Sequence, residues 1–308
     1  MYRKILVPLD GSDFAESALP PALSIAERGG GEIHLVAVVT TLPPLMFSEV
    51  DESYVKGWFR EEGLRAEEYL TKVRDRISTE ETPIHIRVLN GAPADVLDER
   101  IRKTDVDLVV MTTHGRGPLR RFWIGSIADG LVRRGPCPIL LWRPDEEGDA
   151  DRSLRPTFQH ALVPLDGSDR SREILPEVVN AAKLFDARVS LVSVAPTFFP
   201  VASAYLPHAV EEDHERDTRI GELRSHLEKV ADELEGQGIQ ATADVVTGQD
   251  AADAILEHRE KIGADFVAMS THGRGGVSRM VLGSVADKVI RGGKVPVLVH
   301  RHTGSADE

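Results

Sequence analysis

Two aspartates, each at the end of the same three-residue segment, are the first candidates for binding a ligand. The segment Pro8-Leu9-Asp10 ends an apolar run, and Pro164-Leu165-Asp166 repeats it. A helical pattern follows each aspartate. A carboxylate in this setting can accept hydrogen bonds from a ribose hydroxyl or an amine. The alternative is a turn residue that caps the following helix, and the residues themselves leave both interpretations open.

A glycine loop and a glycine–serine pair form the second pattern. Nine residues separate Gly115 from Gly125-Ser126, and the same spacing separates Gly273 from Gly283-Ser284. Glycine permits a positive φ and a close approach of the backbone, so that free N–H groups can point at a phosphate. A helix that starts at the serine adds a hydroxyl donor and a favourable partial charge. The spacing predicts a phosphate cradle, with two ordinary glycine turns as the alternative.

Other nucleotide and catalytic motifs do not occur. The sequence holds no Gly-x-x-x-x-Gly-Lys-Ser/Thr, which disfavours a P-loop enzyme, and no Gly-x-Ser-x-Gly. Gly115 and Gly117 lack the third glycine of a dinucleotide fingerprint. His114 and His272 have no nucleophile at a fixed spacing, so we interpret them as loop-ordering groups and assign no catalytic residue. The histidine spacings predict no metal site.

These patterns occur twice because the chain contains an internal repeat. Residues 6–13 return unchanged as residues 162–169, and residues 111–143 align without a gap with residues 269–301, with 16 of 33 positions identical. Such a long period indicates a duplicated domain. We place the first domain at residues 1–146, a polar, acidic linker at 147–155, the second domain at 156–302 and a tail at 303–308.

Alternating strand and helix patterns must position these residues. Strands are expected at residues 4–9, 32–39, 84–89, 106–112 and 138–142, and helices at 13–27, 52–77, 92–102 and 126–133. The first helix is expected to be capped by Ser12 or Asp13, and the long helix of the second half has Leu223, Leu227, Val230 and Leu234 on one stripe. Each half is therefore predicted to be α/β, with an open, mostly parallel five-stranded sheet and helices on both faces. Such sheets bind ligands beyond the carboxyl ends of strands, where the strand order reverses.

The composition predicts a soluble cytoplasmic protein. Of 308 residues, 41% are hydrophobic and 28% charged, as in ordinary globular domains. The net charge of −13 argues against nucleic-acid and anionic membrane partners. Cys137 is the single cysteine, so no internal disulfide is expected, and no apolar run suits a signal peptide or a membrane span.

Taken together, Pro-x-Asp after a strand, Thr-His-Gly, nine residues and Gly-Ser resemble the universal stress protein family. The resemblance covers nearly the whole chain, twice. The nucleotide motif of that family is glycine, two residues, glycine, nine residues, then glycine with serine or threonine. The last two glycines and the serine match in both halves, whereas Thr112 and Ser270 replace the first glycine.

The resemblance implies that each half binds an adenine nucleotide, ATP or else AMP or ADP, with Mg²⁺ as a companion ion. The adenosine end would contact Asp10 and Asp166 with the backbone of Leu9 and Leu165, and Val38 and Val194 would line the adenine slot. Met111 and Met269 would lie at the base of the loop. The phosphates would meet Gly115, Gly125, Ser126 and Ile127 in one half and Gly273, Gly283, Ser284 and Val285 in the other. Arg116 and Arg274 would neutralise phosphate charge, with solvated surface arginines as the alternative.

Three functions follow as hypotheses. The first is a non-catalytic adenine-nucleotide-binding protein with a regulatory or stress-response role. The second is an ATP-hydrolysing or nucleotide-transferring enzyme in which Asp10 or Asp166 holds magnesium. The third is a nucleotide-free protein interaction module, which the changes at Thr112 and Ser270 allow. Intact ATP that co-purifies would favour the first, ADP or AMP the second, and an empty protein the third; the partner protein is unknown.

The last strand of each half, residues 138–142 and 296–300, is expected at a sheet edge. An edge strand exposes unpaired N–H and C=O groups, and the resemblance implies that single-domain relatives pair through this strand. The linker of about ten residues can span ~30 Å. We therefore expect an intramolecular, pseudo-twofold pair of domains in which these strands meet antiparallel. Homodimerisation through other surfaces stays open.

Overall fold

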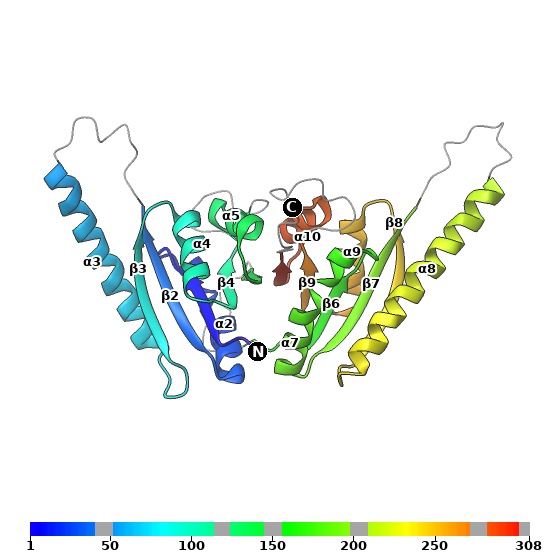
Figure 1. Cartoon of the computed structure of the whole chain (residues 1–308), viewed down its shortest axis with the longest axis horizontal. Coiled ribbons are helices and arrows are strands. Elements are labelled where there is room, and N and C mark those ends of the chain that lie inside the picture. The colour runs from blue at the N-terminus through cyan, green and yellow to red at the C-terminus, as the bar shows by residue number, and fades with distance from the viewer. Residues whose placement is uncertain (41–51, 114–123, 145–155, 198–208, 272–281, 302–308) are drawn as a thin grey trace. The chain divides into compact units, whose positions relative to one another are not determined.

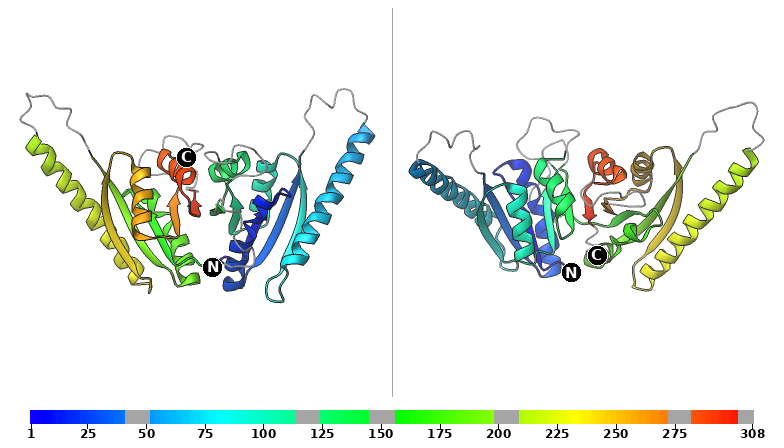
Figure 2. Two further views of the ribbon diagram at one scale, coloured as in Figure 1. Left: turned by 180° about the vertical axis from the view of Figure 1, so that it is seen from behind. Right: turned by 45° about the horizontal axis from the view of Figure 1, so that its top comes forward.

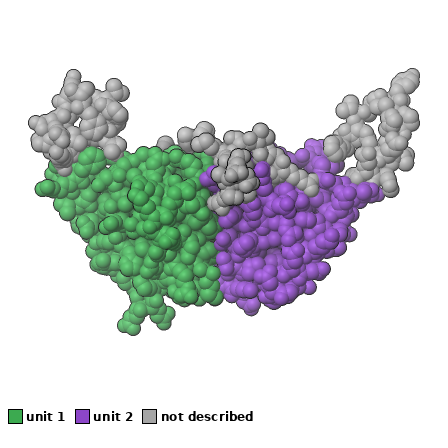
Figure 3. Space-filling model, viewed as in Figure 1, with its two compact units in different colours: residues 1–157 green, residues 158–308 purple. Residues whose placement is uncertain are grey.

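The computed structural model describes residues 1–40, 52–113, 124–144, 156–197, 209–271 and 282–301 (Figure 1). The chain divides into two compact units, Met1–Thr157 and Phe158–Glu308, which Figure 3 colours separately. Each unit is α/β, with a parallel sheet between helices, as the sequence predicts.

Strands and helices alternate in both units. In unit 1 the order is β1 (Lys4–Pro8), α1 (Asp13–Glu16), α2 (Leu19–Gly29), β2 (Glu32–Val39), α3 (Glu52–Ile77), β3 (Ile84–Asn90), α4 (Pro93–Lys103), β4 (Leu108–Thr112), α5 (Ser126–Arg134) and β5 (Ile139–Trp142). In unit 2 it is β6 (His160–Pro164), α6 (Asp169–Arg172), α7 (Leu175–Phe185), β7 (Arg188–Pro196), α8 (Ala209–Glu235), β8 (Ala241–Gly248), α9 (Ala251–Ile262), β9 (Phe266–Ser270), α10 (Ser284–Gly292) and β10 (Val297–His300). The predicted alternation is confirmed.

The prediction of a single helix over residues 13–27 is wrong. α1 ends at Glu16, and α2 begins at Leu19. Pro20 and Pro21 lack the N–H groups that a continuous helix would bond to the preceding turn, and their rings crowd that turn. The chain therefore bends between two short helices. Ser12 is the N-cap, as predicted, and its Oγ accepts a bond from the Ala15 N–H at 3.1 Å.

The strand order reverses in the middle of each sheet. Within unit 1 the order is β3-β2-β1-β4-β5, and within unit 2 it is β8-β7-β6-β9-β10. All of these neighbours within a unit are parallel. The chain runs outward from β1 to β3 and returns to the other side of β1 with β4. The switch point of each sheet therefore lies between its first and fourth strands, β1 and β4 or β6 and β9.

Both faces of the central strands are covered. Ile5, Leu6 and Val7 of β1 are fully buried, as expected for strands between two helical layers. Figures 1 and 2 show α3 against one face of the unit 1 sheet and α4 with α5 on the other. The predicted apolar stripe of α8, Leu223 to Leu234, is buried. Among the described residues, no helix combines the length and the apolar character that crossing a membrane requires.

Candidate functional site

The predicted site begins where β1 and β4 end side by side. Because the two strands are parallel neighbours, their carboxyl ends lie at one edge of the sheet, at the switch point. The Leu9 N–H still donates to the Val36 carbonyl of β2 at 2.8 Å, so sheet pairing continues one residue beyond β1. Asp10 is the next residue and is exposed. The Leu165 N–H makes the same bond to Val192 in unit 2, and Asp166 follows it, half-buried.

Asp10 organises the turn into α1. Its Oδ1 accepts bonds from the Ser12 N–H at 3.0 Å and from the Ser12 hydroxyl at 2.5 Å. Gly11 has a φ of +80°, a left-handed conformation that suits glycine. Ser12 in turn caps α1. The interpretation of Asp10 as a turn residue therefore has a structural basis, while its Oδ2 is bonded to none of the residues described and is available to a ligand.

The same turn recurs in unit 2. Asp166 Oδ1 accepts bonds from the Ser168 N–H at 2.9 Å and the Ser168 hydroxyl at 2.6 Å, and Gly167 has a φ of +81°. Ser168 Oγ accepts from the Ser171 N–H at 3.2 Å to cap α6. Two units with different surroundings thus keep the same carboxylate geometry at this edge.

The start of α5 is tied directly to the end of β4. The Gly125 N–H donates to the Thr113 carbonyl at 2.6 Å. No side chain caps this helix start among the residues described, so the N–H groups of its first turn, including Ser126 and Ile127, lack intrahelical partners and can bind an anion. Ser126 is exposed. In unit 2 the Gly283 N–H donates to Thr271 at 2.9 Å, and Ser284 and Val285 begin an equally uncapped α10.

Glycine at these helix starts does not serve to reach a positive φ. Gly125 has φ −58° and ψ 147°, and Gly283 has φ −59° and ψ 142°. Other residues adopt these angles readily. Of the two properties that glycine offers, a positive φ is not used at these positions, and the other is the absence of a Cβ, which lets a ligand approach the backbone.

Two further pairs of predicted residues lie close to this edge. Met111 and Met269 are buried within β4 and β9, one residue before each strand ends. Val38 and Val194 are half-buried near the ends of β2 and β7, the strands beside β1 and β6. Their places suit the base of a loop and the side of a slot. Gly115, Arg116, Gly273 and Arg274 lie outside the described residues, and their roles stay predictions.

The residues that replace the first glycine of the family motif face inward. Thr112 and Ser270 are both buried. The Ser270 hydroxyl donates a long bond, 3.4 Å, to the Ser171 carbonyl of α6. In unit 2 this hydroxyl is therefore engaged with a helix end, and it is not an outward-facing donor.

A second hydroxyl bond distinguishes the two units. The buried Ser193 of β7 donates to the Leu165 carbonyl at 2.5 Å. Unit 1 has Ala37 at the same place, one residue after the partner of Pro8 in β2. Leu165 is a residue whose backbone was predicted to contact the nucleotide, so one lone pair of its carbonyl is already used. Sequence reasoning missed this bond; its signal is a serine within an apolar strand.

A polar cluster behind the Asp10 turn holds α3 against α1. Glu16 is buried; its carboxylate accepts a bond from the Tyr69 hydroxyl at 3.0 Å and pairs with Arg76. Burial raises the pKa of Tyr69 well above its usual range, and the charges of Glu16 and Asp10 add to the effect. Tyr69 therefore stays a donor. Unit 2 reverses the charges, with Arg172 of α6 paired to Glu233 of α8 at 2.7 Å.

Comparison with known proteins accounts for the duplicated architecture. The model of the universal stress protein family matches residues 1–143 and 157–301. A universal stress protein of Methanocaldococcus jannaschii is 32% identical over 142 residues, which is 46% of this chain and 82% of that protein. A universal stress protein of Mycobacterium tuberculosis is 27% identical over 283 residues, covering 88% of this chain and 86% of that protein.

Solved structures agree at the level of the fold. The crystal structure of a universal stress protein from Archaeoglobus fulgidus superposes with a TM-score of 0.69 at 21% identity and covers 97% of this chain and 96% of that one. A putative universal stress protein from Pseudomonas aeruginosa superposes with a TM-score of 0.64 at 17% identity, with coverages of 97% and 93%. The chain therefore belongs to the universal stress protein family, whose domain it contains twice.

Proposed function

We propose that each unit binds an adenine nucleotide at the carboxyl edge of its sheet, and that the chain is a non-catalytic regulatory or stress-response protein of the cytoplasm. The observation that supports the proposal is the uncapped start of α5, which is bonded to the residue after β4, the strand that pairs with β1 at the switch point. α10 repeats it in unit 2. Membership of the family supports the same conclusion.

The phosphates would occupy the helix starts. Backbone N–H groups and the positive end of a helix attract a small anion, which compensates locally for the acidic chain, whose net charge is −13. Asp10 Oδ2 would accept from a ribose hydroxyl, and Val38 would flank the base. Gly115 and Arg116 would complete the cradle, and Mg²⁺ would accompany ATP. Gly273, Arg274 and Asp166 would have the corresponding roles in unit 2.

A nucleotide-free interaction module is the second candidate, and two observations favour it for unit 2. The Ser193 hydroxyl occupies the Leu165 carbonyl, and Ser270 is bonded to α6. Both use groups that a nucleotide would approach. Enzymatic hydrolysis or transfer needs a residue that activates a nucleophile, and the described part of the site offers no such residue beyond the two aspartates. The pairing of the units through their final strands stays a prediction.

The test is calorimetric titration of the full chain, stripped of nucleotide, with ATP, AMP and cyclic AMP. The proposal expects saturable ATP binding with up to two equivalents per chain, and ATP recovered intact after prolonged incubation. Binding at a single site that Gly125→Val weakens and Gly283→Val leaves unchanged would assign unit 2 to the interaction module. Absence of binding to all three nucleotides would refute the proposal, and steady release of phosphate would favour the enzyme.

A further inference from the structure

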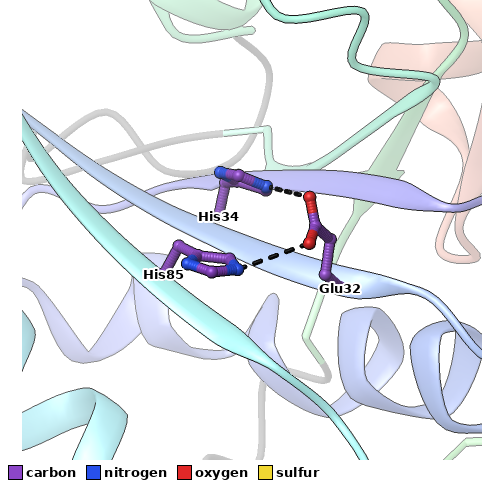
Figure 4. Close-up of side chains that lie close together, drawn as sticks. All are labelled: Glu32, His34 and His85. Atoms are coloured by element: carbon purple, nitrogen blue, oxygen red, sulfur yellow. Dashed lines mark hydrogen bonds and ion pairs between the residues drawn. The ribbon is translucent and has the colours of Figure 1, made fainter.

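Three side chains that can bind a metal converge on β2 and β3, near the amino ends of these strands. Glu32 begins β2, and His34 follows two residues later, so both side chains lie on one face of the sheet. His85 of β3 is the register partner of His34 and lies beside it. Figure 4 shows both imidazoles directed at the same carboxylate. The predicted nucleotide site lies at the other end of β2, about 20 Å away at the rise of a strand.

The spacing of the ligand atoms is close to that of a metal site. His34 Nε2 lies 2.8 Å from Glu32 Oε1, and His85 Nε2 lies 3.3 Å from Glu32 Oε2. The three ligand atoms all lie within 4.8 Å of one another. Ligands at about 2.1 Å from a tetrahedral zinc ion are about 3.4 Å apart. The His85 contact already has about this length, the His34 contact is about 0.6 Å shorter, and no separation within the group exceeds it by more than about 1.4 Å.

We propose that Glu32, His34 and His85 form a binding site for a divalent transition-metal ion of the zinc type. Two imidazoles and one carboxylate favour Zn²⁺, Co²⁺ or Ni²⁺ over Mg²⁺ and Ca²⁺, which prefer oxygen ligands only. The side chain of His85 is 54% exposed and that of Glu32 33% exposed, so an ion can enter from solvent and water can complete the coordination. Three protein ligands with one open position make a geometry that zinc adopts.

The protonation states suit this role. Burial lowers the pKa of His34 from its usual value, and the hydrogen bond from His34 lowers the pKa of Glu32. Neutral imidazole and ionised carboxylate are the forms that bind metals. Each ring would carry its proton on Nδ1 when Nε2 binds the ion. The charges of His85 and Lys4 act on both Glu32 and His34, and the Lys4 ammonium donates to the Thr104 carbonyl at 2.8 Å.

Unit 2 shows that the sheet does not need these residues in order to form. Ser190 and Thr242 are register partners at the places of His34 and His85, and Arg188 is at the place of Glu32. The hydroxyls of Ser190 and Thr242 lie 2.9 Å apart, and the Ser190 hydroxyl is also hydrogen-bonded to His160 Nε2 at 2.8 Å. The cluster is thus particular to unit 1, and unit 2 supplies the residues for a conservative exchange.

The experiment titrates the metal-free, nucleotide-free full chain with Zn²⁺ by calorimetry and with Co²⁺ by visible absorption. The parent should bind one equivalent of Co²⁺ with the intense visible bands of a low-coordinate ion. His85→Thr and Glu32→Gln should each weaken Zn²⁺ binding by at least about 10-fold, since even outer partners of a metal have that effect. His226→Gln, a histidine change on α8, should leave binding unchanged.

Far-UV circular dichroism of the variants establishes that they are folded, as the threonine at the same position of unit 2 predicts. Two results would overturn the proposal: a parent chain that binds neither ion, or Zn²⁺ binding that is equally tight in His85→Thr and Glu32→Gln. Since no nucleotide is present, neither result bears on the proposed nucleotide sites. ATP affinity, measured separately, should be the same in the parent and in His85→Thr.

Discussion

Valine in place of the glycine at each helix start tests the phosphate cradle most directly. In Gly125→Val and Gly283→Val a branched side chain would cover the N–H groups at the starts of α5 and α10. The φ and ψ angles at both positions are open to valine. Each backbone N–H that bonds Thr113 or Thr271 is retained, because the change affects only the side chain. The fold should therefore survive.

The expected loss of binding is large compared with the loss of stability. A hydrogen bond from an N–H to a charged phosphate contributes about 1.5–3 kcal/mol, and the partial charge of the helix start adds about 0.3–1 kcal/mol. Removing one such bond should cost about 2–3 kcal/mol, which is about 30- to 150-fold in affinity. Glycine to valine at an N-cap costs about 1 kcal/mol of stability, or about 2–4 °C in each unit.

The assay is calorimetric titration of ATP into the double variant Gly125→Val/Gly283→Val, with thermal unfolding measured alongside. Gly63→Val and Gly221→Val are matched controls, since these glycines lie on α3 and α8 with open space around them. The controls should bind ATP as the parent does. A double variant that stays folded and binds ATP with parental affinity would refute the assignment of the phosphate cradle to α5 and α10.

Three further predictions concern single contacts. Ser193→Ala releases the Leu165 carbonyl and should raise the ATP affinity of unit 2 about 5-fold, which corresponds to about 1 kcal/mol. The measurement is made in the Gly125→Val background, and an unchanged affinity would contradict the role of that carbonyl. Glu16→Ala removes a buried acceptor from Tyr69 and should lower the free energy of unfolding by about 1–3 kcal/mol. Glu233→Ala, which breaks an exposed ion pair, should lower it by less than about 1 kcal/mol. Equal losses of stability in the two variants would contradict the role of burial. Burial lowers the pKa of His160, so unfolded chains take up its proton first as the pH falls. The contribution of His160 to the free energy of unfolding should be fully present above about pH 6.5 and should decrease below it. Urea unfolding at about pH 7.5 and about pH 5 should therefore show a smaller loss of stability in His160→Gln than in the parent, and equal losses would contradict this prediction.

Much of the fold follows from the sequence because local patterns report local geometry. The strand over residues 32–39 and the helix over residues 52–77 have the bounds that their patterns predict. Asp10 and Gly125 belong to one edge of the sheet because parallel strands that alternate with helices all end on the same side. The break between α1 and α2 has a signal in the sequence, Pro20 and Pro21. The missing N–H groups and the rings of these prolines outweigh the apolar periodicity of residues 13–27.

The sequence by itself determined the duplicated α/β units, the sheet edge at which we propose that a nucleotide binds, and the residue types available there. Only the tertiary structure decided which side chains meet. Ser193 reaches the Leu165 carbonyl, and His34 lies beside His85, through strand register. Register between β2 and β3 depends on how the long helix between them packs on the sheet, and a shift of one residue would turn each side chain to the opposite face. Contacts between residues 28 and 51 positions apart therefore depend on global packing, which periodicity along the chain does not record.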